Sequence, residues 1–223
     1  MVFFQQIIAV ATKDIKTELR TRETLSGMLV FALLVVLIFN FAFDLRVDNV
    51  RSVVPGVLWV TFIFAGVLGL NRSFASERDQ GSLEGLLLAP LDRSALYLGK
   101  VCANVVFMAI TEAIVFPVAT VLFNLNLLRP QLFVIALLGT IGFAGVGTLF
   151  SAIAINTRAR DVMLPILLLP VSVPIVIAAV KLTAAVLDTG VVAEAGMWWP
   201  LLISFDAVFL VVSALIFEFA VEY

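Results

Sequence analysis

The 223-residue sequence contains no histidine and only one cysteine. Without histidine it lacks the commonest protein ligand of zinc and haem iron and the usual general base at neutral pH, and a Ser-His-Asp triad is excluded. The single Cys102 cannot form an intrachain disulfide. There is also no G-x-x-x-x-G-K-[ST] loop for nucleotide phosphates and no H-E-x-x-H metal motif. These absences argue against an enzyme and predict that the chain itself binds neither a metal nor ATP.

Charge is scarce as well, since 13% of the residues are charged and 62% are hydrophobic. Soluble domains are about one quarter charged and about one half apolar. A chain of this length has too little interior to hide so much apolar surface from water. Lipid is therefore the expected solvent, and the net charge of −2 gives no indication of a nucleic-acid partner.

Six apolar stretches are long enough to cross a bilayer as helices, which requires about 20 residues each. They are residues 25–43, 54–70, 98–123, 132–155, 162–180 and 199–217. The fifth contains Pro165, Pro170 and Pro174, so we expect it to be kinked or broken. The sequence thus predicts an all-α integral membrane protein with one transmembrane domain over residues 1–223.

The distribution of lysine and arginine predicts the orientation. With the N-terminus inside the cell, ten of these residues fall in inner segments and four in outer segments. Positive residues concentrate on the cytoplasmic side of membrane proteins. Both termini are therefore expected in the cytoplasm.

Residues 1–22 have the pattern of an amphipathic helix. Apolar residues recur at spacings of three and four, whereas Lys13, Lys16 and Arg20 lie largely off that stripe. This favours a helix in the inner membrane interface with its cations near anionic headgroups. The alternative is a helical extension of the first span whose stripe packs on a neighbour. Trp198 and Trp199, at the start of the sixth span, favour an interfacial aromatic belt over a haem-stacking role.

The segment 71–94, expected in the cytoplasm, has an unusual pattern. Charged residues at its start are followed by Gly81, which can end a helix, and by Ser82, which can cap a short new one. An apolar face then follows, and it either docks into a partner protein or rests on the bilayer. The candidate coupling residues are Glu77, Arg78, Asp79, Gly81, Ser82, Leu83, Glu84, Leu86 and Leu87.

Two carboxyl groups fall within predicted spans, Glu112 in the third and Asp206 in the sixth, at similar predicted depth. Ionised carboxylates at that depth cost several kcal/mol, so such groups are protonated, paired or exposed to water. One hypothesis is a polar lining that includes Asn104; the other, slightly favoured, is protonated carboxyls with hydrogen-bond partners in the bundle. Lys100, one turn before Asn104, is expected to snorkel to the inner interface.

The sequence P-G-V-L-W-V at 55–60, the loop E-R-D-Q-G-S-L-E-G-L-L-L-A-P-L at 77–91 and Lys100 together resemble the haem exporter protein B family, CcmB. The resemblance covers most of the chain and is most specific over residues 54–100. Family members often carry histidine at the position of Asn104.

The resemblance implies a type II ABC exporter permease in the bacterial inner membrane, acting in cytochrome c maturation. It implies a CcmA-like ATPase that binds ATP, CcmC-like and CcmD-like membrane partners, and haem as the cargo of the complex; a second copy of the chain is a further candidate partner. On this interpretation, segment 71–94 couples ATP hydrolysis by the partner to helix movement. The alternatives are an ABC permease for a lipid, glycan or drug, and a proton-coupled carrier that uses Glu112 and Asp206.

Overall fold

The computed structural model describes residues 2–43, 49–79, 81, 85, 91–155, 157, 159–189 and 196–221. Every regular element within these residues is an α-helix, which confirms the all-α prediction. The helices are α1 (Val2–Thr21), α2 (Glu23–Phe43), α3 (Val50–Ser73), α4 (Ala75–Asp79), α6 (Arg93–Phe123), α7 (Pro130–Ala154), α8 (Arg160–Asp188) and α9 (Trp198–Val221).

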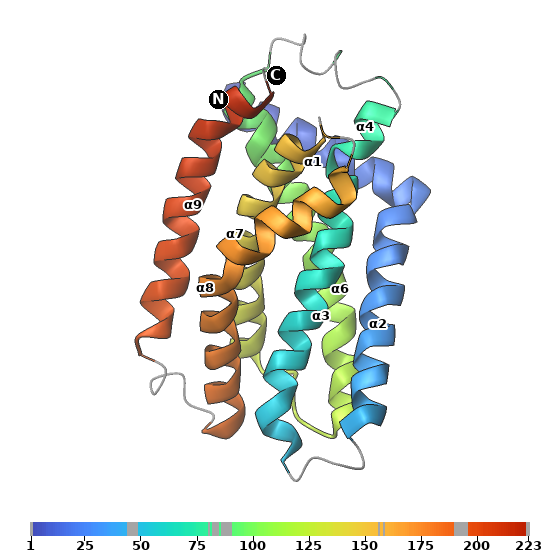
Figure 1. The fold of residues 1–223 in the computed structure, drawn as a ribbon, viewed down its shortest axis with the longest axis vertical. Helices are drawn as coiled ribbons and strands as arrows, with labels where there is room; N and C mark the ends of the chain where they lie inside the picture. The colour runs from blue at the N-terminus through green and yellow to red at the C-terminus, as the bar shows by residue number, and fades with distance from the viewer. Residues whose placement is uncertain are drawn as a thin grey trace.

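Six helices, α2, α3, α6, α7, α8 and α9, are long and apolar enough to cross a membrane, as predicted. They form an upright bundle, and α1, α4 and the C-terminal end of α9 lie at one end of it (Figure 1). We call this the α1 end. The C-terminal ends of α2, α6 and α8 and the N-terminal ends of α3, α7 and α9 lie at the opposite end.

Two helices begin four and five residues earlier than the apolar runs suggested, because polar residues cap them. The Asn49 side chain accepts a hydrogen bond from the Arg51 backbone N–H at 3.1 Å, and α3 starts at Val50. The Asp92 carboxylate accepts one from the Ser94 backbone N–H at 2.9 Å, and α6 starts at Arg93. Both helices therefore extend beyond their most apolar part.

The three prolines of α8 bend the helix without breaking it. Pro165, Pro170 and Pro174 all lie within one continuous helix, Arg160–Asp188. Figure 1 shows an oblique part of α8 near the α1 end and an upright part beyond it. Proline removes a backbone hydrogen bond and clashes with the preceding turn, which accounts for the bend.

Helix α1 is separate from the first span and lies across the end of the bundle (Figure 1). Between them Arg22 adopts a left-handed conformation with φ 57°. The buried Glu18 carboxylate then accepts a hydrogen bond from the Leu25 backbone N–H at 2.8 Å, near the start of α2. The turn at Arg22 and the Glu18 contact argue against α1 as a straight extension of α2.

Helices α3 and α7 are the innermost, with 72% of their central residues buried, against 17% in α2. Close packing on α7 depends on its glycines. Trp59 from α3 lies directly against Gly139, and Leu70 lies against Gly147. Gly139 and Gly147 therefore serve the close packing of α3 on α7.

Candidate functional site

The predicted coupling segment begins where α3 ends, at the α1 end of the bundle. Ser73 is the last residue of α3, and α4 follows directly as a helix of five residues. Glu77 is buried in α4, whereas Arg78 is exposed. Gly81 has a positive φ of 66°, the conformation expected of a glycine that ends a helix. We call residues 74–92, between α3 and α6, the connector. Within it, Ser82, Leu83, Glu84, Leu86 and Leu87 lie outside the described residues.

Lys100 of α6 is buried beneath this segment. Its ammonium donates to the Ser73 carbonyl oxygen at 2.7 Å and lies 2.8 Å from the Glu77 carboxylate and 3.1 Å from the Asp14 carboxylate. It also lies 4.8 Å from the centre of the Phe74 ring, within range of a cation–π interaction. A buried ammonium is tolerated because it is paired and hydrogen-bonded on several sides.

The expectation that Lys100 snorkels to the interface is therefore wrong. Only 2% of its side chain is exposed. Helix α1 covers this part of α6 so closely that a side chain at Gly99 would overlap Val10 and approach the Ile7 carbonyl oxygen. The lysine finds two carboxylates within the protein and does not need the membrane surface.

Lys13 completes the cluster from α1. Its ammonium pairs with Glu77 and lies 3.1 Å from the Asp14 carboxylate. Partial burial lowers the pKa of Lys13, but the hydrogen bond to Glu77 and the charges of Asp14 and Glu77 outweigh it, so the pKa lies above its ordinary value of 10.5. Two cations and two anions thus join α1, α4 and α6. We call Lys13, Asp14, Glu77 and Lys100 the charge network.

Asn104 lies one turn along α6 from Lys100. Its amide nitrogen donates to the Ser73 hydroxyl at 3.1 Å and to the Thr148 hydroxyl of α7 at 2.9 Å. Asn104 therefore extends the polar contacts around Ser73 from α6 to α7. Neither of these bonds connects it to Glu112 or Asp206.

Glu112 and Asp206 are both buried, but they lie in different helix interfaces. Glu112 accepts a hydrogen bond from the Thr140 hydroxyl, between α6 and α7. Asp206 of α9 lies directly against Gly142 of α7. Both contacts fall within three residues of α7, so the two carboxyls have similar depth. Residues 140 and 142 point to different sides of a helix, so α7 stands between the carboxyls.

The two carboxyls also differ in their partners. Neither Asp206 oxygen has a hydrogen-bond partner among the described residues. The Glu112 carboxyl has the Thr140 hydroxyl as its partner. Glu112 therefore matches the interpretation of a hydrogen-bonded intramembrane carboxyl better than Asp206 does.

The predicted membrane anchors occupy both ends of the bundle. Lys16 and Arg20 are exposed on α1, as are the apolar Phe4, Ile8 and Leu19. Trp198 and Trp199 form the first turn of α9, at the opposite end, and are half-buried against the main core. The arrangement is compatible with membrane-interface positions for both sets.

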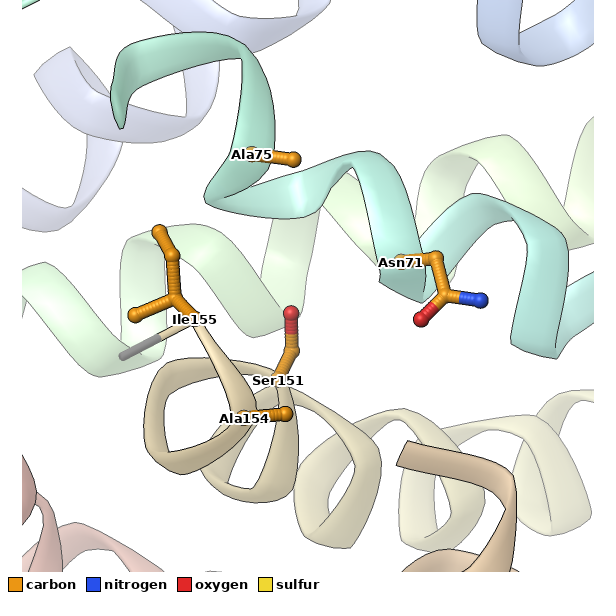
Figure 2. A pocket seen from close by; sticks show the side chains of 5 residues that line it. All are labelled: Asn71, Ala75, Ser151, Ala154 and Ile155. Atoms are coloured by element: carbon orange, nitrogen blue, oxygen red, sulfur yellow. The ribbon is translucent and has the colours of Figure 1, made fainter. Parts of the chain in front are cut away.

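A small hollow at the α1 end lies between α7 and the junction of α3 and α4 (Figure 2). Its lining consists of Asn71, Ala75, Ser151, Ala154 and Ile155. The Ser151 hydroxyl is already engaged, because it donates to the Leu70 carbonyl oxygen at 2.7 Å. The hollow thus offers a ligand few free polar groups. The described part of the chain holds no cluster of three or more residues suited to bind a metal ion.

Sequence reasoning missed Asp14, Ser73 and Thr148. Asp14 is one of two acidic residues among the basic residues of α1, and Lys100 is the eighth residue of α6. Together these two residues indicated an ion pair, because a lysine within an apolar helix needs an acidic partner. The partner could not be chosen from the sequence, since Asp14, Glu77 and Lys100 come from three separate segments.

The fold and these contacts define a multi-pass α-helical membrane protein with the charge network at the α1 end of the bundle. The sequence model of the family described as CcmB protein matches residues 5–223, nearly the whole chain. The chain therefore belongs to the CcmB protein family, and the resemblance drawn from its motifs is confirmed.

Several curated relatives carry the name Heme exporter protein B, and three of them illustrate the similarity. The protein from Pseudomonas aeruginosa is 28% identical over 159 residues, which is 71% of each chain. The protein from Rhodobacter capsulatus is 29% identical over 177 residues, 78% of this chain and 80% of the relative. The protein from Haemophilus influenzae is 26% identical over 180 residues, 80% of each chain.

Proposed function

We propose that this chain is the permease subunit of an ATP-driven exporter that serves haem export or delivery for c-type cytochrome biogenesis. Membership of the CcmB family and the name of the curated relatives support haem as the cargo. The chain has no P-loop of its own, so the energy must come from a partner ATPase. The proposal places the protein in the bacterial inner membrane, with a type II ABC exporter fold and both termini in the cytoplasm.

The observation that carries this proposal is the anchoring of the connector. The carbonyl of Ser73 and the carboxylate of Glu77 are both held by the buried Lys100 ammonium. A solvated loop would not need a buried charged anchor at its start. A segment that receives force from a partner does need one, because its movement has to reach the spans.

In the proposed mechanism, closure of the partner ATPase on ATP displaces the connector, and α3 and α6 carry the displacement into the bundle. CcmC-like and CcmD-like membrane proteins complete the assembly, and haem is the substrate that the assembly handles. The chain itself binds no cofactor in this proposal. The purified chain alone should therefore show neither ATPase activity nor a stable haem Soret band, and either signal from clean material would overturn the proposal.

Co-purification in mild detergent tests the partner directly. The tagged chain should retain a P-loop ATPase, and deletion of residues 82–88 or the substitution Glu84→Lys should abolish its retention. The substitution Asp188→Lys, at an exposed residue at the opposite end of the bundle, is the matched charge-reversal control and should retain it. Equal retention by the deletion variant and the control would contradict the proposal.

The cargo is tested separately. An exporter of a lipid, glycan or drug would have the same fold and the same ATPase. A gene for a CcmC-like protein beside the gene for this chain favours haem. Loss of haem attachment to c-type cytochromes in a deletion strain, with restoration by the intact gene, is the expected result; normal attachment in that strain would contradict haem as the cargo.

The rival proton-coupled carrier has one observation in its favour, the buried Asp206 carboxyl, which has no hydrogen-bond partner within the described part of the chain. A carrier of that kind would transport without an ATPase and would respond to the proton gradient. Transport that persists without the partner ATPase and stops on collapse of the gradient would favour the rival.

A further inference from the structure

Helix α1 is attached to the connector by charges as well as by apolar contact. Its apolar attachment is to α6, where Val10 and the Ile7 carbonyl pack over Gly99. Its charged attachment runs through Lys13, which pairs with Glu77, and through Asp14, which lies 3.1 Å from the Lys100 ammonium. The two attachments fall on neighbouring turns of α1.

At the base of the connector, Phe74 is buried in an apolar cluster with Tyr97 and Phe217. Among the side chains of α4 that the structure describes, Ala75 and Glu77 are buried and Arg78 is exposed. Glu77 uses both carboxylate oxygens in the charge network, one toward Lys13 and the other toward Lys100. Displacement of α4 must therefore carry Lys13 and Lys100 along or separate opposite charges. Lys13 is partly exposed, but separation would leave the buried Glu77 and Lys100 without their partners, which is costly.

Stability alone does not explain why four charged groups are placed here. Well-packed apolar residues in place of a buried ion pair are often at least as stabilising. Charged pairs differ from apolar contacts in that they hold two groups in one relative position. This property suits a contact through which one segment moves another. The network is also balanced, with two cations and two anions, so it can move as a unit without exposing a net charge.

We propose that Lys13 and Asp14 are positioning residues that couple α1 to the connector, so that α1 moves with α4 when a partner displaces it. The inference rests on the proposed function, since the partner ATPase supplies the displacement. In this account α1 is a further helix, in addition to α3 and α6, that moves when the connector is displaced. Its exposed apolar residues, Phe4, Ile8 and Leu19, would transmit the movement to the inner membrane interface.

The substitution pair Lys13→Met and Asp14→Asn isolates this coupling. It removes one positive and one negative charge, both from α1, so net charge is unchanged. Lys100 keeps Glu77 at 2.8 Å and the Ser73 carbonyl at 2.7 Å, so no buried charge is left without a partner. The matched control is Tyr97→Phe in α6, which removes the hydrogen bond from the Tyr97 hydroxyl to the Gly145 carbonyl oxygen of α7 at 3.0 Å and leaves the charge network intact.

Spin-label distances in the complex with its partner ATPase, in lipid nanodiscs, provide the readout. Cys102, the only cysteine, is replaced by serine. The first label pair, at Thr17→Cys and Asn126→Cys, measures the distance between α1 and the opposite end of the bundle. The second pair, at Asn126→Cys and Asp188→Cys, measures a distance between the spans that does not involve α1. All three label sites are exposed. Distances are measured without nucleotide and with ATP, magnesium and vanadate.

We expect both distances to shift with nucleotide in the parent complex and in Tyr97→Phe. In the Lys13→Met/Asp14→Asn variant, the first shift should be lost and the second kept. The inference is overturned if the first distance never shifts while the second does, if the variant keeps the first shift in full, or if Tyr97→Phe also loses it. Should the double variant fail to assemble, Asp14→Asn alone should reduce the first shift, and an undiminished shift would overturn the inference. If no ATPase binds or neither distance shifts, the proposed function itself fails.

Discussion

Lys100 and Glu77 face one another at 2.8 Å, with only 2% and 9% of their side chains exposed. The pair joins α6 to the first turn after α3. A buried charge that loses its partner is strongly destabilising. We expect Lys100→Met to lower the unfolding free energy by about 3 kcal/mol, because Glu77 and Asp14 would then share Lys13 alone. Thermal unfolding in detergent, followed by size-exclusion profile, measures the change.

The double variant Lys100→Met/Glu77→Leu is the control for this prediction. It leaves Lys13 and Asp14 as a pair at 3.1 Å, so it should be less destabilised than Lys100→Met alone. A midpoint for Lys100→Met equal to that of the parent protein would show that the network contributes nothing to folding.

The contact between Trp59 and Gly139 predicts an effect of adding a single methyl group. A methyl at Gly139 would overlap the Trp59 ring. Trp59 has little freedom to move, because its Nε1 donates to the Thr183 hydroxyl at 3.0 Å. Gly139→Ala should therefore destabilise by about 1–3 kcal/mol.

Gly27 of α2 offers a matched comparison, because nothing lies within 4 Å of the corresponding position. Gly27→Ala should stabilise by about 0.5–1 kcal/mol, since glycine in a helix carries an entropic cost. Thermal unfolding of both variants checks the pair of predictions, which would be wrong if the two substitutions had effects of the same sign and size.

The two intramembrane carboxyls should respond differently to loss of their polar groups. Asp206 has no hydrogen-bond partner among the described residues, so Asp206→Leu should leave thermal stability unchanged or raise it. Glu112→Leu removes the acceptor of the Thr140 hydroxyl and should destabilise by about 1–3 kcal/mol. Equal losses in both variants would contradict this assignment.

The conservative changes Glu112→Gln and Asp206→Asn test the polar-lining hypothesis. Both should leave the bundle folded, so that any loss is a loss of transport. Transport that survives both changes in full would rule the lining out.

The contribution of Lys13 to α1 docking should depend on pH only in strongly alkaline solution. The pKa of Lys13 is raised above 10.5, because the Glu77 hydrogen bond and the carboxylate charges outweigh burial. A raised lysine pKa stabilises the folded state below the unfolded pKa, and the stabilisation disappears as pH rises through the folded pKa. The difference in stability between the parent chain and Lys13→Met should be constant from neutral pH to about pH 10 and shrink above it.

An environment-sensitive fluorophore at Thr17→Cys, in the Cys102→Ser background, reports α1 docking as pH is raised. The Lys13→Met variant is the reference at each pH. A difference that already shrinks between pH 7 and pH 9 would contradict the placement of Lys13 beside two carboxylates.

The number of spans could be predicted because it depends on the length of apolar runs, which is a local property. The bend of α8 was also local, but the sequence left open whether three prolines bend or break a helix, and the structure shows one continuous helix. The caps at Asn49 and Asp92 moved two helix starts outward, beyond the apolar runs that defined the spans.

The site was harder to predict, since it depends on side chains that meet only in the folded bundle. Glu77 was a candidate coupling residue of segment 71–94, and Lys100 was expected at the inner interface. Each is buried because the other is within reach, and α1 then closes over both through Asp14. No spacing within one segment contains that information.

Photo-crosslinking from the connector tests the central claim most directly. A photoreactive phenylalanine analogue is placed at exposed Gly85 in the connector, or at exposed Asn126 at the opposite end, in cells that contain the whole assembly. The account predicts a crosslink from position 85 to a P-loop ATPase and none from position 126. The account would be contradicted if position 85 reached only lipid or solvent in an assembly that is active in export.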